Sequence, residues 1–170
     1  MTQIGERVAT PSSSEVEDPC KDEGDHVWEE VDSGITPDDQ IDKLENDISN
    51  LEGKPSRMAQ KRGHEFEKKA VIDNKDKLPI EKCGKEYRCK KCNKVQEVDI
   101  AGKDRIGEAK SRKAKGVKGK ADQCKWIKSI QSQCFDSTKK PLAKIDGSLE
   151  DVQKSKEIYE RRGFDVEIVG

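Results

Sequence analysis

Two short segments near the middle of the chain most constrain its fold, because their pattern predicts a pair of adjacent β-strands. In residues 95–100 and 105–110, apolar side chains alternate with polar or charged ones. The four residues between these segments include Gly102 and are typical of a hairpin turn. An isolated hairpin is marginally stable in water, so further elements must pack against it.

Helices and strands are predicted to alternate around this hairpin. Apolar residues at spacings of three and four, with capping residues such as Thr36 and Ser148, indicate the helices. This order predicts an α/β fold in which helices flank a central mixed β-sheet. The predicted helices are residues 36–55, which form a short amphipathic segment, and residues 56–69, 121–134 and 148–162; the further strands are residues 141–146 and 164–169.

Acidic and basic residues are segregated along the chain, although its 170 residues carry a formal net charge of only −1. Residues 1–55 contain 16 acidic and four basic side chains, so their net charge is −12, whereas residues 56–170 have a net charge of +11. Residues 1–35 also lack apolar periodicity, which predicts a largely irregular acidic leader or linker. The basic part suits a polyanion, above all nucleic acid; a solvated basic surface is the alternative.

The chain shows no sign of a membrane segment or a secretory signal peptide. No stretch approaches the roughly 18 consecutive apolar residues that a membrane-spanning helix needs. The first 25 residues have neither a basic start nor an apolar centre. If the protein leaves its cell, we expect a different export route.

Three residues of the predicted hairpin are candidates for a catalytic site. Glu108 and Lys110 are two positions apart in one strand and therefore emerge on the same face. Asp99 lies near the end of the preceding strand, where a short hairpin brings it beside Glu108. Two adjacent carboxylates are costly without a counter-ion, and hard cations such as Mg²⁺ prefer oxygen ligands. We therefore expect Asp99 and Glu108 to bind Mg²⁺ or Mn²⁺.

This arrangement suits phosphodiester hydrolysis. A divalent cation at the two carboxylates can polarise a phosphate and activate a water molecule. Lys110 can orient that water or stabilise negative charge that develops on the phosphate. Glu67, on the preceding predicted helix, is a candidate for a second metal or for holding a coordinated water molecule.

The spacing of these residues resembles the PD-(D/E)xK restriction-endonuclease-like nuclease superfamily. Asp99, eight further residues and Glu108-Ala109-Lys110 are similar to its D...ExK signature, and the string from Gly63 to Glu67 is similar to the G...FE string on its first core helix. The resemblance implies that residues 56–170 form a Mg-dependent endonuclease domain. Val98 stands where the motif's name has Pro. Some relatives carry a later Gln and Tyr, and of this pair only Gln123 is present.

Within the superfamily, the small size and charged leader are most similar to toxin domains at the C-termini of bacterial polymorphic toxins. This resemblance implies export by a dedicated secretion system, action in the cytoplasm of a rival cell and a cognate immunity protein. DNA is the favoured substrate. We expect a basic loop at residues 111–120 and the next helix to contact it through Lys113, Lys115, Lys118, Lys120 and Gln123.

Other functions fit parts of the pattern. An RNase on the same fold would use the same metal site, because that site acts on the phosphodiester. A non-catalytic, zinc-containing nucleic-acid-binding module would explain the basic charge. Two further alternatives remain. The protein could bind a partner through its acidic leader, or the charges of the hairpin could simply be solvated.

The six cysteines suggest a second metal site with a structural role. Cys89 and Cys92 have the two-residue separation of a zinc knuckle, and Cys83 precedes them by six residues. Candidates for the fourth ligand are Cys124, Cys134 and His64. Buried thiols or disulfides are the alternative interpretations.

Overall fold

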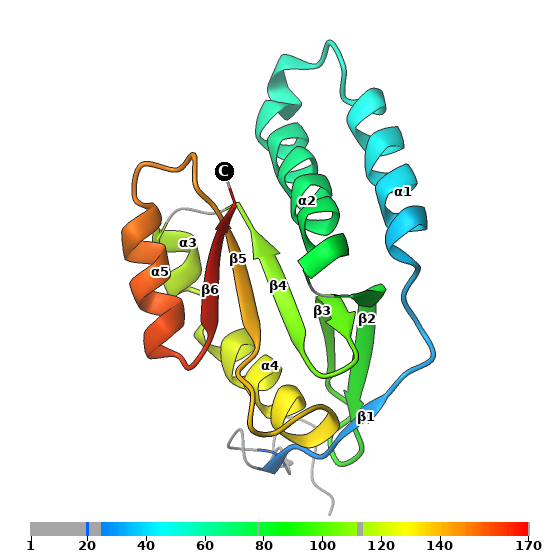
Figure 1. Cartoon of the computed structure of the whole chain (residues 1–170), viewed down its shortest axis with the longest axis vertical. Coiled ribbons are helices and arrows are strands. Elements are labelled where there is room, and N and C mark those ends of the chain that lie inside the picture. Colours follow the sequence, from blue (N-terminus) through cyan, green and yellow to red (C-terminus); the bar gives the residue numbers. More distant parts are fainter. Residues whose placement is uncertain (1–19, 21–24, 78, 112–113, 170) are drawn as a thin grey trace, which may run out of the picture.

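The computed structural model describes residues 20, 25–77, 79–111 and 114–169, and its centre is a six-stranded mixed sheet between helices (Figure 1). The strands follow one another in the sheet in chain order. The pairs β1–β2, β2–β3 and β3–β4 are antiparallel, whereas β4–β5 and β5–β6 are parallel. The strands are β1 (Trp28–Glu30), β2 (Ile80–Cys89), β3 (Val95–Gly102), β4 (Ile106–Lys110), β5 (Leu142–Asp146) and β6 (Asp165–Val169). The predicted α/β architecture is confirmed.

Helices cover both faces of the sheet. The helix α1 packs against α2, which contacts β4 and β6, while α4 contacts β1, β3 and β4 and α5 contacts β5 and β6 (Figure 1). Thr36 caps α1 by accepting a hydrogen bond from the Asp39 N–H, 3.2 Å away. The helices are α1 (Pro37–Asn50), α2 (Met58–Lys77), α3 (Ala114–Lys118), α4 (Ala121–Cys134) and α5 (Val152–Arg161), with a 3-10 turn at Pro55–Arg57. In the described part of the chain, no helix has the length and apolar character needed to cross a membrane.

The apolar core is divided between the two faces of the sheet. The larger cluster joins Val98 and Ile106 of the hairpin to Ile127 and Ile130 of α4. Smaller clusters lie under α2, where Phe66 and Ala70 pack with Ala109 and Val169. The central hairpin is therefore packed on both faces.

The structure confirms the hairpin and the helix at residues 121–134, but it corrects other boundaries. Residues 111–120 were expected to form a loop, yet they contain the short helix α3. The helix expected from Ser148 begins at Val152, because Ser148 donates hydrogen bonds to the Asp146 carboxylate through its N–H and its hydroxyl group. The ten-residue strand β2 was not predicted, since charged residues obscure its alternation.

The expectation of an irregular leader through residue 35 is corrected for its last third. Strand β1 pairs with β2, and the side chains of His26 and Trp28 are buried. The Trp28 N–H donates to Gln133 Oε1 at 2.9 Å, and the indole N–H donates to Ser129 on α4. Residues 25–35 therefore belong to the folded domain.

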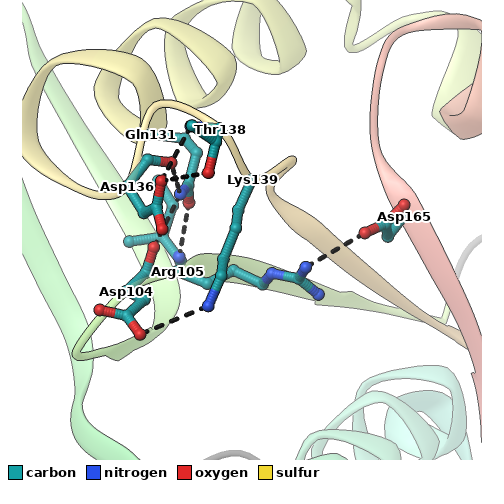
Figure 2. Close-up of polar contacts among 8 residues, drawn as sticks. Asp104, Arg105, Gln131, Asp136, Thr138, Lys139 and Asp165 are labelled. Atoms are coloured by element: carbon teal, nitrogen blue, oxygen red, sulfur yellow. Dashed lines mark hydrogen bonds and ion pairs between the residues drawn. The ribbon is translucent and has the colours of Figure 1, made fainter.

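Gln131 links the end of α4 to the turn of the central hairpin (Figure 2). Its side chain is 1% exposed and makes three hydrogen bonds to the backbone. The amide oxygen accepts from the Ile106 N–H at 2.9 Å, and the amide nitrogen donates to the carbonyl oxygens of Asp104 and Asp136. This side chain therefore fixes the start of β4 relative to α4.

Replacing Gln131 by Leu leaves the Ile106 N–H without a partner, while the carbonyl oxygens of Asp104 and Asp136 keep the hydrogen bonds from the Asp136 and Lys139 N–H groups. Because an unsatisfied buried donor costs about 1–3 kcal/mol and each further lost hydrogen bond about 1 kcal/mol, we expect the free energy of unfolding to fall by about 3 kcal/mol. The measurement is urea denaturation followed by circular dichroism. Ser132→Leu, at the exposed neighbouring position, is the matched control and should change stability by less than about 1 kcal/mol. Equal losses in both variants would contradict this role.

Candidate functional site

Asp99 and Glu108 face each other across the hairpin, and the carboxylate of each accepts a hydrogen bond from a backbone N–H of the opposite strand. The pairing of Ile100 with Gly107 places the two acidic residues at the next position of the antiparallel ladder. The Asp99 N–H donates to Glu108 Oε2 at 3.1 Å, and the Ala109 N–H donates to Asp99 Oδ2 at 2.8 Å. Each carboxylate is therefore held in place by the backbone of the opposite strand.

Glu108 is a buried carboxyl group with an acidic neighbour. Only 5% of this residue is exposed. Burial, followed by the negative charge of Asp99, raises the pKa of Glu108 well above 4.5. A bound cation would remove much of this electrostatic cost.

Lys110 supplies positive charge beside the two carboxyl groups. Its Nζ lies 3.8 Å from Asp99 Oδ2, and its side chain is 28% exposed. The positive charge of Lys110 opposes the rise in the pKa values of Glu108 and Glu67. The structure thus brings together the three residues of the predicted motif, with the ammonium group at the solvent side.

Glu67 on α2 belongs to the same electrostatic environment. Burial and then the charge of Asp99 raise the pKa of Glu67 to about 7, and Glu97 adds to this effect while Lys110 opposes it. Glu67 Oε1 also lies 4.0 Å from the imidazole of His64. Four carboxyl groups therefore gather around Lys110, which leaves the region with excess negative charge when all are ionised.

Asp99, Glu108 and Glu67 do not form a group of three ligands placed to hold a metal ion in the described part of the chain. Mg²⁺ is commonly held by one or two carboxylates, with water and substrate phosphate completing its octahedron. Asp99 and Glu108 can supply such a pair, and Glu67 lies outside it.

A small pocket opens beside Glu108 and Lys110. Two of the residues predicted to contact nucleic acid, Lys120 and Gln123, also line it. Cys124 and Tyr159 form other parts of its wall. The side chains of Lys115 and Lys118 are exposed on α3, whereas Lys113 lies outside the described residues.

Arg162 fixes α3 next to this pocket. Its guanidinium group donates hydrogen bonds to the carbonyl oxygens of Val117 and Lys118, at 2.7 and 3.0 Å. It also contacts Cys124 Sγ at 3.5 Å. The basic helix α3 is thereby held at one side of the carboxylate pair.

Comparisons with protein-family models, curated proteins and solved structures found no match.

A buried cysteine and histidine cluster could hold a metal ion such as zinc. Cys89 and Cys92 belong to it, as predicted, and their partners are Cys20 and His26. The prediction of Cys83 and Cys124 as ligands is corrected: Cys83 packs with Val71 and Ile100, and Cys124 lies beside Arg162. His64 and Cys134, the other candidates, are also outside the cluster.

The two missed ligands are far from the knuckle in sequence. Cys20 lies in the acidic segment expected to be irregular, and its separation from Cys89 is 69 residues. The available signal was the presence of only two histidines in the chain, one of which follows Cys20 by six residues. Sequence reasoning considered only the other one, His64.

The pKa of Glu67 predicts a pH-dependent effect on stability in the metal-free protein. Between pH 4.5 and about 7, the unfolded chain loses this proton more readily than the folded chain, so ionisation destabilises the fold as pH rises. Glu67→Gln removes this cost. Because 38% of the Glu67 side chain is exposed, we expect the free energy of unfolding at pH 8 in EDTA to rise by about 1 kcal/mol or less. This gain corresponds to a rise in Tm of roughly 2 °C. The gain should vanish near pH 4.

Differential scanning fluorimetry over pH 4–8 measures this effect. Glu65→Gln is the control, because Glu65 is exposed two positions earlier on the same helix. A Tm difference for Glu67→Gln that is independent of pH would contradict the assigned electrostatic environment.

Proposed function

We propose that this protein is a metal-dependent endonuclease that hydrolyses phosphodiester bonds, with DNA as its favoured substrate. The observation that carries the proposal is the buried Glu108 beside the half-buried Asp99, each held by a backbone N–H of the opposite strand, with Lys110 next to them. A hairpin with merely solvated charges would expose Glu108, yet this residue is 5% exposed. A purely nucleic-acid-binding module would gain nothing from burying that carboxyl group.

Asp99 and Glu108 are the residues that would hold Mg²⁺ or Mn²⁺, and Glu67 would act from α2 on a water molecule in the ion's shell. When bound, the cation supplies Lewis acidity and makes a water molecule more acidic. The raised pKa values of Glu108 and Glu67 support a cation at this position, because added positive charge favours the ionised carboxylates.

The protein's own groups then have distinct roles. The backbone N–H groups of Asp99 and Ala109 fix the two carboxylates, so that little reorganisation accompanies the reaction. The Lys110 ammonium group, partly exposed next to them, would stabilise negative charge that develops on the phosphate. Glu67 would orient a water molecule at the site from α2.

The charge around the site supports a polyanionic substrate. The residues from 56 onward carry a net charge of +11. Lys120 and Gln123 line the pocket next to Glu108, and α3 carries Lys115 and Lys118 at its exposed surface. These side chains would position a phosphate backbone.

The proposal extends to a biological setting. We place the protein among interbacterial toxin domains that are exported by a dedicated secretion system, act in the cytoplasm of a target cell and are neutralised by a cognate immunity protein. The support is the sequence resemblance of the D...ExK string and the charged leader to such domains.

Near-isosteric variants test the catalytic assignment. Asp99→Asn, Glu108→Gln and Lys110→Met keep the side-chain volume, so each should remain folded while cleavage of plasmid DNA by Mg²⁺-loaded protein falls at least about 100-fold. Agarose gels with EDTA controls measure the loss. Lys103→Met and Asp104→Asn, at the exposed hairpin turn, should keep full activity.

Parallel digestion of total RNA identifies the substrate. If the protein cleaves RNA and not DNA, and the same three variants lose this activity, the assignment of the metal site stands and the substrate is RNA. Full activity in a folded Asp99→Asn or Glu108→Gln variant would overturn the assignment of that residue.

The basic residues near the pocket should control how salt affects binding. Affinity falls as salt concentration rises, and each phosphate contact contributes about 0.9 to the steepness of log affinity against log salt. Changing Lys115, Lys118 and Lys120 together to Ala should therefore make this dependence less steep by about 2–3. Fluorescence anisotropy of labelled duplex, in an Asp99→Asn background, gives the slope. A matched triple change at the exposed Lys90, Lys91 and Lys103 should alter it by less than about 1. Equal slopes in the two triple variants would contradict the proposed contact surface.

A further inference from the structure

We infer that Cys20, His26, Cys89 and Cys92 form a structural zinc site, which fastens the chain before β1 to the turn between β2 and β3. The ligand atoms of these four residues all lie within 4.8 Å of one another. Three sulfur atoms and one imidazole nitrogen are the ligand types of structural zinc sites with one histidine. This set is separate from the carboxylates of Asp99 and Glu108.

Two separations within the cluster are close to those of a tetrahedral zinc centre. With Zn–S bonds near 2.3 Å and Zn–N bonds near 2.1 Å, tetrahedral angles place two sulfurs about 3.8 Å apart and a sulfur and a nitrogen about 3.6 Å apart. Cys20 Sγ lies 3.5 Å from Cys89 Sγ, and Cys92 Sγ lies 3.5 Å from His26 Nδ1. Only small shifts of these side chains would be needed to accommodate the ion.

Other interpretations of the cluster fit less well. A disulfide needs two sulfurs about 2.0 Å apart, and the structure describes all six cysteines as not joined in disulfides. Thiolates are soft ligands that do not suit Mg²⁺, whereas zinc binds sulfur and imidazole together. Four protein ligands leave no open position, and Cys20, His26 and Cys89 are all buried, which indicates a structural role.

The surrounding contacts show what the ion would hold in place. The Val27 N–H donates to Cys89 Sγ at 3.4 Å, and the Lys90 N–H donates to the Val27 carbonyl oxygen at 2.8 Å. The Gln133 side chain donates to the His26 carbonyl oxygen at 2.8 Å. Strand β1 has only three residues, so zinc would join it to the β2–β3 turn and, through Gln133, to α4.

The zinc site and the carboxylate pair are separable along β3. Val95 pairs with Arg88, the residue before Cys89, whereas Asp99 lies four residues farther along the strand. Four residues of extended chain span roughly 13 Å. Loss of zinc should therefore weaken the fold at the β1 edge of the sheet and leave the ligands of the carboxylate site in place.

Zinc content of the full chain, measured by native mass spectrometry, tests the inference. We expect one zinc ion per chain in the wild type and in Cys134→Ser, whose exposed thiol lies outside the cluster. Cys20→Ser and Cys92→Ser should each weaken zinc binding at least about 100-fold in competition with a chelating dye, since even residues that only orient a ligand contribute 10–100-fold. Cys83→Ser and Cys124→Ser should bind zinc like the wild type.

Cobalt substitution keeps the inference testable where a ligand variant fails to fold. Wild-type protein loaded with Co²⁺ should show the intense visible bands of a tetrahedral site and the near-ultraviolet charge-transfer bands of thiolate ligands. Weak bands of an octahedral site, or full zinc binding by a folded Cys20→Ser variant, would overturn the assignment. Zinc loss in Cys124→Ser together with retention in Cys20→Ser would overturn it as well.

Discussion

The carboxyl group of Glu108 is buried against the sheet beside the carboxyl group of Asp99. Two neighbouring negative charges at a buried position are electrostatically unfavourable, and the surrounding structure accommodates them. The strand register that brings them together also aligns the backbone donors that hold them. On the same strand, Ala109 packs against α2, so β4 presents small apolar and charged side chains to opposite faces. The metal dependence of the proposed activity follows from this single arrangement.

Access to that pair is set by the helices around it. Helix α2 places Glu67 within the electrostatic influence of Asp99, while α3 and α4 bring Lys120 and Gln123 to the pocket beside Glu108. Arg162 fixes α3 through two backbone carbonyl oxygens. Negative charge at the carboxylates and positive charge at the rim of the pocket are the two features that the proposed phosphate chemistry requires.

The sequence predicted the parts of the fold that depend on local pattern. Alternation and the turn at Gly102 predicted the β3–β4 hairpin, and with it the proximity of Asp99 and Glu108. The cysteine cluster was predicted only in part, because Cys20 and His26 reach Cys89 through long-range packing of β1 on α4. Strand β2 and helix α3 were missed because their charged residues give weak periodicity, and tertiary contacts stabilise both.

Anomalous diffraction from crystals grown with Mn²⁺ tests the central claim most directly, since it locates the cation relative to individual oxygen atoms. The account predicts a peak between the side chains of Asp99 and Glu108, with metal–oxygen distances of about 2.1–2.2 Å. The peak should disappear in crystals of Glu108→Gln. A peak elsewhere in the molecule, with none at these two carboxylates, would contradict a metal-dependent site at Asp99 and Glu108.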